Sequence, residues 1–444
     1  FYYDAAGNKI RMYTGLASPL TISGLDTVTA NGDSDYSITK YSYDRFGNLT
    51  DMTDPAGQHE TYSYDLSGNM TGKTDRNGNI ITISYDGLNR ILNKSVTTPD
   101  GLGNKSYNNT YTLTGSLLTT TGDKVNTTYA YDDLGRTKTE TRTDGVTETY
   151  TYDTGNNRTS VIIKKGGNQI QNTGYTYDKI NRLYQVKDNG QVRATYAYDD
   201  NGNRQTLTYN NGNITEYQYN LANKVKTLTN KNGASILSQY TYNYYLDGNQ
   251  ADKTETVTNQ STEYLYDGLG RLQTETEKEN GNVTSAVNYT YDDYNNRASM
   301  TKDGVTASYN YDSNNRLVTE IKVTGDVTET TRYGYDNNGN QLYKASETVK
   351  PATAGEAESI SVSVSGVSGD GSVSFNEYDG FNQLVKVTSG DMTSTYEYNG
   401  DGLRNSKAVN GTVTTHIWDG NQITLEFNGT GAVTNKYLLG INLI

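Results

Sequence analysis

The sequence predicts an all-β fold made of tandem antiparallel β-hairpins, each about 21 residues long. Three observations predict it. A Tyr-Asp pair recurs along the chain in thirteen full copies, with weaker copies between them. A Gly or Asn lies four residues after the Tyr in every copy anchored on Tyr, and a second Tyr often lies two residues before it. Such a period is typical of a repeat architecture, which lengthens without needing a new core.

The Asp and the following Gly or Asn define the turn of each hairpin. Asp-x-x-Gly is typical of a type I turn, in which the Asp side chain accepts hydrogen bonds from the turn backbone. Gly and Asn tolerate a positive φ best, so the last turn residue is expected to be left-handed and to start a G1 bulge. The structural repeat residues expected from the clearest copies are Tyr43, Asp44, Gly47, Tyr64, Asp65, Gly68, Tyr131, Asp132, Gly135, Tyr198, Asp199, Gly202, Tyr266, Asp267, Gly270 and Arg271.

Strands are expected on both sides of each turn. Two Tyr separated by one residue, such as Tyr196 and Tyr198, point to the same face of a strand. The second strand often opens with Arg and an aliphatic residue, and we expect this Arg to stack on the Tyr rings or to pair with the turn Asp. Further turns close the repeat at Asn77-Gly78, Asp144-Gly145, Asn189-Gly190, Asn211-Gly212, Asn232-Gly233 and Asn280-Gly281.

Stacking of neighbouring hairpins supplies the burial that a single hairpin lacks. Seventeen hairpins give about 34 strands, and at ~4.8 Å each they make a strip of roughly 160 Å. A twisted sheet of this width must coil, so we expect a spiral of about one turn.

The whole chain, 1–444, is expected to be one repeat array and a fragment of a larger protein, because it begins with Phe1 and starts and ends inside the pattern. Two segments depart from the period. Residues 12–40 fit degenerate repeats, and residues 345–375 form an irregular Ser/Val/Gly-rich insertion whose alternation fits a strand and whose composition also fits an exposed loop.

Composition excludes several classes of protein. The chain has no Cys, which excludes disulfides and thiolate metal sites. It has no apolar stretch of membrane-spanning length, and its net charge of -13 disfavours nucleic acid and anionic membranes as partners.

Residues that carry chemistry are sparse. The only histidines, His59 and His416, have no second His at metal-ligand spacing, and we expect His59 on the surface and His416 in a packing position. Asp199 to Asn203 alternates oxygen ligands as a calcium loop does, but it lacks the remaining EF-hand positions and coincides with the turn pattern. The sequence therefore predicts a non-enzymatic protein with no catalytic, metal-binding or cofactor-binding residues. Rows of Tyr could bind sugars or peptides, although packing between strands explains them as well.

The run from Tyr196 to Arg204, Tyr-Ala-Tyr-Asp-Asp-Asn-Gly-Asn-Arg, resembles the YD repeat of the rearrangement-hot-spot (Rhs) family, as does the run from Tyr264 to Leu272. That family includes bacterial Rhs toxins, wall-associated proteins, toxin-complex shell components and the teneurins. The resemblance covers essentially the whole chain. It implies that the hairpins coil into a hollow β-shell, which in toxin members encloses a C-terminal effector.

The function expected from this resemblance is that of a structural shell segment of a large secreted or surface Rhs protein. Its partners would be the remainder of its own polypeptide, including shell caps, a C-terminal core or toxin cargo. The alternative is an extended extracellular adhesin or recognition module that binds carbohydrate or protein.

Overall fold

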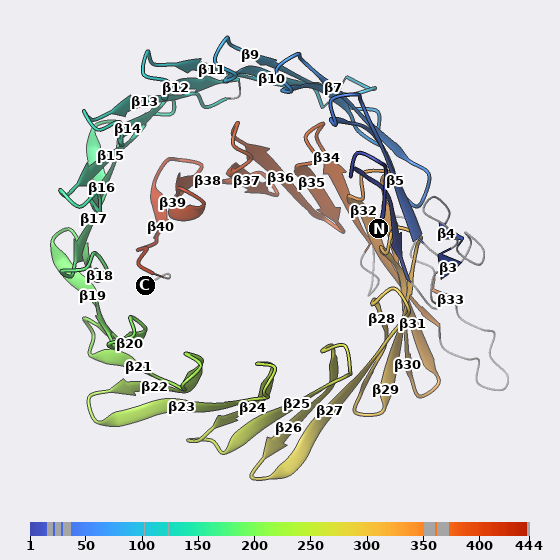
Figure 1. Ribbon diagram of the computed structural model, residues 1–444. Coiled ribbons are helices and arrows are strands. Elements are labelled where there is room, and N and C mark those ends of the chain that lie inside the picture. Colours follow the sequence, from blue (N-terminus) through green and yellow to red (C-terminus); the bar gives the residue numbers. More distant parts are fainter. Residues whose placement is uncertain are drawn as a thin grey trace. The chain divides into compact units, whose positions relative to one another are not determined.

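The computed structural model describes residues 1–15, 21–22, 28–29, 37–101, 103–122, 124–349, 360–361 and 373–441. These residues form 40 β-strands (Figure 1). They contain no helix, and therefore none that is long and apolar enough to cross a membrane. A single sheet holds 38 of the strands, and β3 and β4 pair separately. The all-β fold of tandem antiparallel hairpins that the sequence predicts is confirmed.

The strands divide between two compact units. Unit 1 comprises Phe1–Asn109 and Tyr289–Val413, and unit 2 comprises Thr110–Asn288 and Thr414–Ile444. We call the earlier segment of each unit its first pass and the later segment its second pass.

The strands of unit 1 are β1 (Tyr2–Tyr3), β2 (Lys9–Thr14), β3 (Thr21–Ile22), β4 (Val28–Thr29), β5 (Ser37–Tyr43), β6 (Leu49–Thr53), β7 (His59–Tyr64), β8 (Met70–Thr74), β9 (Ile80–Tyr85), β10 (Ile91–Thr97), β28 (Arg297–Lys302), β29 (Val305–Tyr311), β30 (Leu317–Thr324), β31 (Val327–Tyr335), β32 (Gln341–Val349), β33 (Ile360–Ser361), β34 (Ser374–Tyr378), β35 (Leu384–Ser389), β36 (Met392–Tyr398) and β37 (Arg404–Val409).

The strands of unit 2 are β12 (Leu117–Thr121), β13 (Thr127–Tyr131), β14 (Thr137–Arg142), β15 (Val146–Tyr152), β16 (Arg158–Lys165), β17 (Asn168–Tyr177), β18 (Leu183–Asp188), β19 (Gln191–Tyr198), β20 (Arg204–Tyr209), β21 (Asn213–Tyr219), β22 (Val225–Asn232), β23 (Ser235–Tyr244), β24 (Gln250–Glu255), β25 (Gln260–Tyr266), β26 (Leu272–Glu279), β39 (Gln422–Asn428) and β40 (Val433–Lys436). The unit boundaries fall within β11 (Lys105–Tyr111), β27 (Asn282–Tyr291) and β38 (Thr412–Asp419).

Each repeat hairpin closes through what we call its bulge turn, the four residues that follow the repeat Tyr. In the β19–β20 hairpin, Tyr198 pairs with Arg204 but Ala197 pairs with Thr206, so β20 carries one extra residue. Gly202 ends this turn at a φ of 85°. A positive φ recurs at all seventeen expected positions, which are Gly7, Gly47, Gly68, Asn89, Gly115, Gly135, Asn156, Asn181, Gly202, Asn223, Gly248, Gly270, Asn295, Asn315, Gly339, Asn382 and Gly402. The expected left-handed turn residue is therefore present in all seventeen repeats, and the bulge is present wherever the strand register is described.

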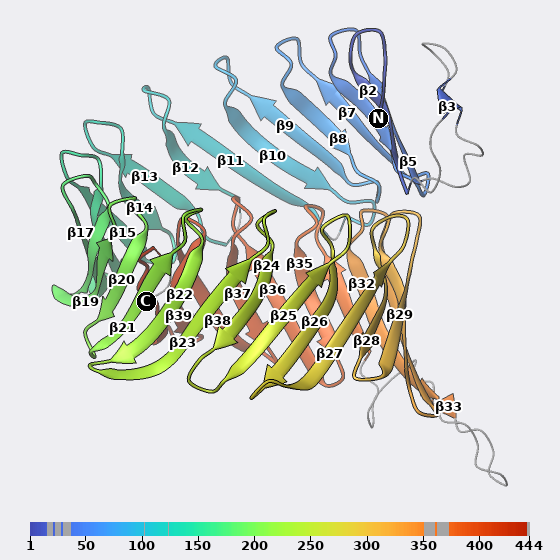
Figure 2. The ribbon, with the colours of Figure 1, turned by 60° about the horizontal axis from the view of Figure 1, so that its bottom comes forward.

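The opposite ends of the strands are joined by return turns, which connect one repeat hairpin to the next. All six return turns expected from the sequence have their Gly at a positive φ, for example 85° at Gly145 and 79° at Gly281. Strands β20 to β26 of unit 2 run side by side between the two kinds of turn (Figure 2). Each repeat thus presents its bulge turn at one edge of the strip and its return turn at the other.

The strands that flank each irregular segment in the sequence are neighbours in the strip. Strand β2 pairs directly with β5 across the first segment, and β32 pairs with β34 across the second. The two-residue strand β33 also pairs with β32. Most of residues 12–40 and 345–375 lies outside the described residues, so their assignment as degenerate repeats and as an insertion stays a prediction.

Within each unit the second pass packs against the first at a nearly constant distance in sequence. In unit 1, Asn314 Nδ2 donates to Asp54 Oδ2 over 2.9 Å, a separation of 260 residues. In unit 2, Arg158 and Asp419 form a bidentate ion pair over 2.5 and 2.6 Å, a separation of 261 residues. The chain therefore returns to an earlier part of itself after roughly twelve repeats.

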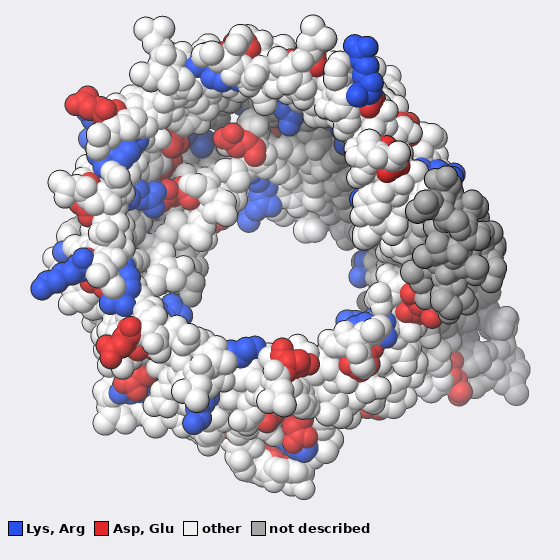
Figure 3. Space-filling model, viewed as in Figure 1, with Lys and Arg blue, Asp and Glu red and all other residues white. Residues whose placement is uncertain are grey.

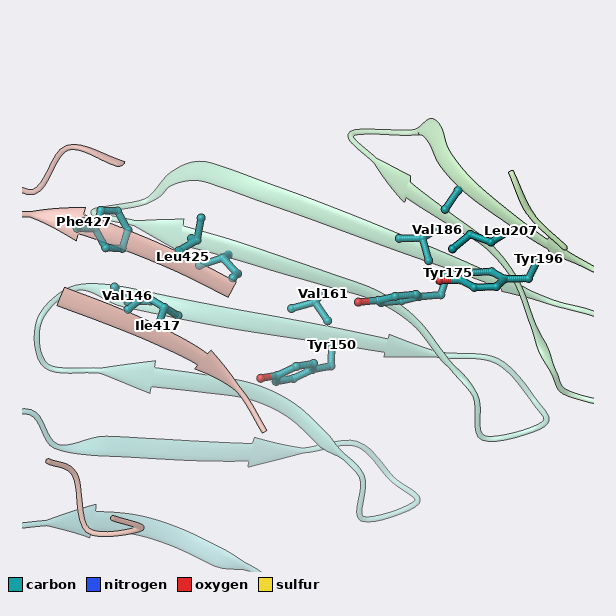
Figure 4. Close-up of a cluster of buried hydrophobic side chains, with 12 residues drawn as sticks. Val146, Tyr150, Val161, Tyr175, Val186, Tyr196, Leu207, Ile417, Leu425 and Phe427 are labelled. Carbon is teal, nitrogen blue, oxygen red and sulfur yellow. The ribbon is translucent and has the colours of Figure 1, made fainter. Parts of the chain in front are cut away.

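The main apolar cluster of unit 2 lies where its second pass covers the face of the first-pass sheet (Figure 4). Ile417, Leu425 and Phe427 of β38 and β39 are almost fully buried. They join a first-pass cluster that comprises Val146, Tyr150, Val161, Ile163, Tyr175, Val186, Ala194, Tyr196 and Leu207. Burial of these side chains stabilises unit 2 through the removal of apolar surface from water.

The left-handed bulge-turn residue provides a direct test of the fold. We expect Gly202→Val to destabilise the β19–β20 hairpin by about 1–3 kcal/mol, because a β-branched residue is strained at this φ. A Cβ at this position would contact nothing closer than 4.0 Å, so the Cβ itself adds no clash to the backbone strain. The control Gly202→Asn should cost much less, because seven repeats have Asn there. Urea unfolding midpoints measure both variants, and equal midpoints for the two would contradict the turn assignment.

Candidate functional site

The repeated Tyr-Asp element is the candidate site that the sequence singles out, and its Asp organises the bulge turn. In the turn that starts at Asp44, Oδ1 accepts hydrogen bonds from the backbone N–H of Phe46 and Asn48, at 2.8 and 2.9 Å. Asp44 Oδ2 accepts a third from Asn48 Nδ2, at 3.0 Å. These donors, the Asn48 side chain first, lower the pKa of Asp44 below its ordinary value. The carboxylate thus acts as a fixed acceptor within its own turn.

In other copies an Arg takes the position of Asn48, and its charged guanidinium makes the same contact with the turn Asp. Arg271 Nε donates to Asp267 Oδ2 over 2.7 Å, and Arg182 Nε donates to Asp178 Oδ2 over the same distance. The Arg182 guanidinium also lies 4.3 Å from the ring centre of Tyr198 in the next repeat. Both predicted roles of the Arg, pairing with the turn Asp and stacking on a Tyr ring, are confirmed.

The Tyr of each pair joins its hairpin to the preceding one. Tyr198 Oη donates to the backbone carbonyl of Leu183 over 2.7 Å, and Leu183 is the residue that pairs with Tyr177 beside the preceding bulge. The same bond, always to the carbonyl six residues after the preceding repeat Tyr, is made by Tyr43, Tyr85, Tyr131, Tyr152, Tyr177, Tyr198, Tyr219, Tyr244, Tyr266, Tyr311, Tyr335, Tyr378 and Tyr398.

Two of these bonds cross the irregular segments. Tyr43 Oη donates to the carbonyl of Lys9, and Tyr378 Oη donates to the carbonyl of Gln341. The Tyr ladder therefore continues across both departures from the period.

Neighbouring bulge turns are also linked along their edge. Asn203 Nδ2 donates to Asn223 Oδ1 at 3.1 Å, and Asn157 Nδ2 donates to Asn181 Oδ1 at 2.9 Å. The acceptor in each pair is the left-handed Asn of the next repeat. Asn at that position therefore adds a link that Gly cannot make.

The predicted repeat residues occupy separate turns along the chain and are not gathered into one site. Tyr43-Asp44-Gly47, Tyr64-Asp65-Gly68, Tyr131-Asp132-Gly135, Tyr198-Asp199-Gly202 and Tyr266-Asp267-Gly270 each belong to a separate hairpin. The calcium-like pattern after Asp199 is a turn of the same kind, in which the Asn203 side-chain nitrogen donates to Asp199 Oδ2. In the part of the chain that the structure describes, no group of three or more His, Asp or Glu is arranged to hold a metal ion.

The two histidines lie as the sequence predicts. The His59 side chain is 61% exposed, and its Nδ1 lies 3.1 Å from Asp51 Oδ2. His416 is fully buried, with its ring edge-on to the Trp418 ring at 6.4 Å between centres.

Sequence reasoning missed a carboxyl pair in unit 2, of which one member is buried. Glu140 of β14 lies directly opposite Glu148 of β15, and the Tyr150 hydroxyl lies 3.3 Å from Glu140 Oε1 and 3.1 Å from Glu148 Oε2. Glu148 is only 2% exposed. Burial, followed by the nearby negative charge of Glu140, raises the pKa of Glu148 to about 8. The sequence signal for this pair was a Glu on each of two adjacent strands. The strand register that places Glu140 opposite Glu148 was not evident from the sequence.

A pocket of about 430 Å³ lies in the second pass of unit 2 and is lined by Trp418, Gln422, Ile423, Tyr437 and Leu439. It combines the only Trp of the chain with a Tyr, a Gln side chain and two aliphatic residues. Trp418 is recognisable in the sequence as a substitute for the repeat Tyr, but the surrounding residues come from outside the repeat pattern.

On the face drawn in Figure 3, the charged side chains of the described residues are of mixed sign, with Lys and Arg interspersed among Asp and Glu. Many are paired within a repeat, as Arg136 is with Asp132.

Comparison with known proteins agrees with this geometry. The RHS Repeat family model matches residues 27–59, 43–80 and 64–102. No curated protein matches the chain. A chain of the Photorhabdus luminescens Tc holotoxin pore is similar at a TM-score of 0.51 and 14% identity, over 98% of this chain and 27% of that chain. Crystal structures of TcdB2-TccC3 and TcdB2-TccC3-Cdc42 each give a TM-score of 0.42 at 14% identity, over 98% of this chain and 28% and 27% of theirs.

The resemblance to the Rhs/YD-repeat family is thereby confirmed over residues 27–102, which carry RHS repeats. The Tc holotoxin similarity shows a shared fold. The chain spans about a quarter of the length of the structures it matches.

The Tyr ladder can be tested by removing one hydroxyl. Tyr198→Phe leaves the Leu183 carbonyl without this donor and should destabilise the local strands by about 1 kcal/mol. Hydrogen exchange of the β18–β20 amides should become faster. The control Tyr184→Phe removes a hydroxyl from a side chain that is 44% exposed and should leave exchange unchanged. Equal exchange in the two variants would rule out a bridging role for Tyr198.

The buried Glu148 beside Glu140 predicts a dependence of stability on pH. The folded chain holds the Glu148 proton more tightly than the unfolded chain, whose carboxyl has the ordinary pKa of 4.5. The stabilisation is therefore complete below about pH 4.5 and is lost as the pH rises towards about 8, by at most about 1.4 kcal/mol per pH unit. Glu148→Gln should flatten the unfolding free energy of unit 2 between pH 5 and 8, whereas Glu377→Gln, at a 60% exposed side chain, should not. An unchanged slope for Glu148→Gln would show that the carboxyl is already ionised at neutral pH.

Proposed function

We propose that this chain is a structural, non-enzymatic wall segment of a large secreted or surface-exposed RHS-repeat protein, and that the wall encloses another part of that protein, such as a toxin or effector. The observation that carries the proposal is the uninterrupted hairpin strip that returns to itself after about 260 residues in each unit. A strip of roughly twelve hairpins, with strands ~4.8 Å apart, has a length of about 120 Å. Closed on itself, that length surrounds a space a few tens of ångströms across.

The distribution of chemistry supports a structural role. The recurring Asp and Tyr are used within the repeat, where Asp accepts from its own turn and Tyr donates to the preceding hairpin. The carboxylates thus serve as turn acceptors in nearly every copy, whereas a catalytic pair would occupy exceptional positions. Fold similarity to a Tc holotoxin chain supports a wall that forms part of a larger assembly.

The alternative is an extracellular recognition module that binds carbohydrate or protein. The Trp418 pocket favours this function, because an aromatic face beside an amide side chain suits a sugar ring. The pocket is local to the second pass of unit 2, whereas the wall accounts for the repeats throughout the chain.

Electron microscopy of the intact protein separates the two functions. We expect a hollow capsule, and digestion with a nonspecific protease should leave the enclosed segment intact until the wall is denatured. The matched control is the same protein with Gly202→Val and Gly270→Val, in which strained turns should open the wall and expose the segment to protease. A solid rod would contradict enclosure, and an open fibre would support the recognition module.

A further inference from the structure

Bulge turns of unit 1 occur in two environments, docked in the second pass and exposed in the first. In the second pass, the two central turn residues contact the first-pass return turns. Asn338 Nδ2 donates to Asp75 Oδ2 at 2.7 Å, and the backbone N–H of Asn337 donates to Asn77 Oδ1 at 3.0 Å. One repeat earlier, Asn314 reaches Asp54 in the same way.

The turn at either end of this row makes an apolar version of the contact. The Phe381 ring lies 5.8 Å from the Tyr107 ring and 4.7 Å from Lys94 Nζ. Its neighbour Gly380 lies so close to Val96 that an added Cβ would come within 2.6 Å of Val96 Cγ2. At the other end, the Tyr294 ring occupies the space that a side chain on Gly15 would need. Three successive bulge turns therefore dock on three successive return turns, and the bulge turn before them contacts Gly15 just after β2.

The corresponding turn residues of the first pass are apolar and exposed. Phe46, Leu66 and Leu88 have exposed fractions of 68%, 100% and 72%. Each lies at one of the two central turn positions that make the docking contacts in the second pass. A row of large apolar side chains exposed to this degree is typical of an interaction surface.

The complementary edge is present and exposed in the same unit. The second-pass return turns at Asp303-Gly304, Gly325-Asp326 and Gly390-Asp391 are all exposed. Val323 and Met392 lie beside them with exposed fractions of 47% and 42%, and they provide an apolar surface comparable to Val96 beside the first-pass return turn. Unit 1 thus has one exposed edge of bulge turns and one exposed edge of return turns. These are the two kinds of edge that contact each other inside the unit.

We propose that the first-pass bulge turns bearing Phe46, Leu66 and Leu88 dock on the second-pass return turns of a second copy of this chain. The contact between copies repeats the contact between the two passes of unit 1. Because the two edges differ, the association is head-to-tail, with each copy leaving one edge of each kind open.

Sedimentation velocity of the full chain tests the proposal. The wild-type chain should show a rising weight-average sedimentation coefficient as its concentration is raised from about 1 μM to about 100 μM. The triple variant Phe46→Asn, Leu66→Asn, Leu88→Asn should remain at the monomer value, because Asn is the natural residue at Asn314 and Asn338 and is compatible with the turn. Circular dichroism confirms that the variant is folded.

A matched variant controls for general loss of apolar surface. Ile80→Thr, Leu92→Thr and Leu342→Thr change side chains of unit 1 that are 52%, 39% and 39% exposed on strands, and association should persist in this variant. The proposal would be overturned if the wild-type protein stayed monomeric at every concentration. It would also be overturned if the strand variant lost association while the turn variant kept it.

The absence of Cys permits a second measurement at the surface itself. In Leu66→Cys the reaction rate with a maleimide should fall several-fold over the same rise in concentration, whereas Leu92→Cys should react at a constant rate. A Leu66→Cys rate that does not depend on concentration, or that falls only when a different protein is added, would exclude a second copy as the occupant of this edge.

Discussion

The left-handed residue at the end of each bulge turn is the constraint on which the rest of the fold depends. It lets the chain reverse and leave one extra residue on the second strand, as at Gly202 before the β20 bulge. The residue just before that extra residue carries the carbonyl to which the next repeat Tyr donates, as Leu183 does for Tyr198. The turn Asp fixes the same loop from within through its backbone donors. Turn geometry and the contact between repeats therefore have one origin.

Burial of the first Tyr in each Tyr-x-Tyr pair shows how the same sequence element takes different roles. Tyr150, Tyr175 and Tyr196 are between 1% and 8% exposed because β38, β39 and the following segment of unit 2 cover them. The backbone N–H of Ile441 even donates to Tyr196 Oη at 3.3 Å. Elsewhere, as at Tyr264, the same position is only partly buried. The Tyr thus suits both a covered and an open sheet, because its ring is apolar and its hydroxyl is polar.

Local structure was predictable from the sequence because it depends on residues within one or two repeats. The turn at Asp199–Gly202, the strand partner of Tyr198 and the pairing of Arg271 with Asp267 all follow from spacing. The pairing of Arg158 with Asp419 and the opposition of Glu140 to Glu148 did not follow. The first joins residues 261 positions apart, and the second depends on a register that a bulge can shift by one residue. The pocket around Trp418 likewise draws on Tyr437 and Leu439, which follow no repeat pattern.

The Tyr ladder also has a direction along the chain. Each Tyr hydroxyl binds a carbonyl in the hairpin before it, so a hairpin is completed only by its C-terminal neighbour. A chain that emerges from a ribosome or a membrane channel with its N-terminus first forms its hairpins in this order. The Tyr of each new repeat then donates its hydrogen bond to the hairpin that has already formed. Growth then needs only short-range encounters, and the long-range contacts at about 260 residues come late. In such a strip the most recently formed hairpin has no C-terminal neighbour yet, so it is always the hairpin least protected against unfolding.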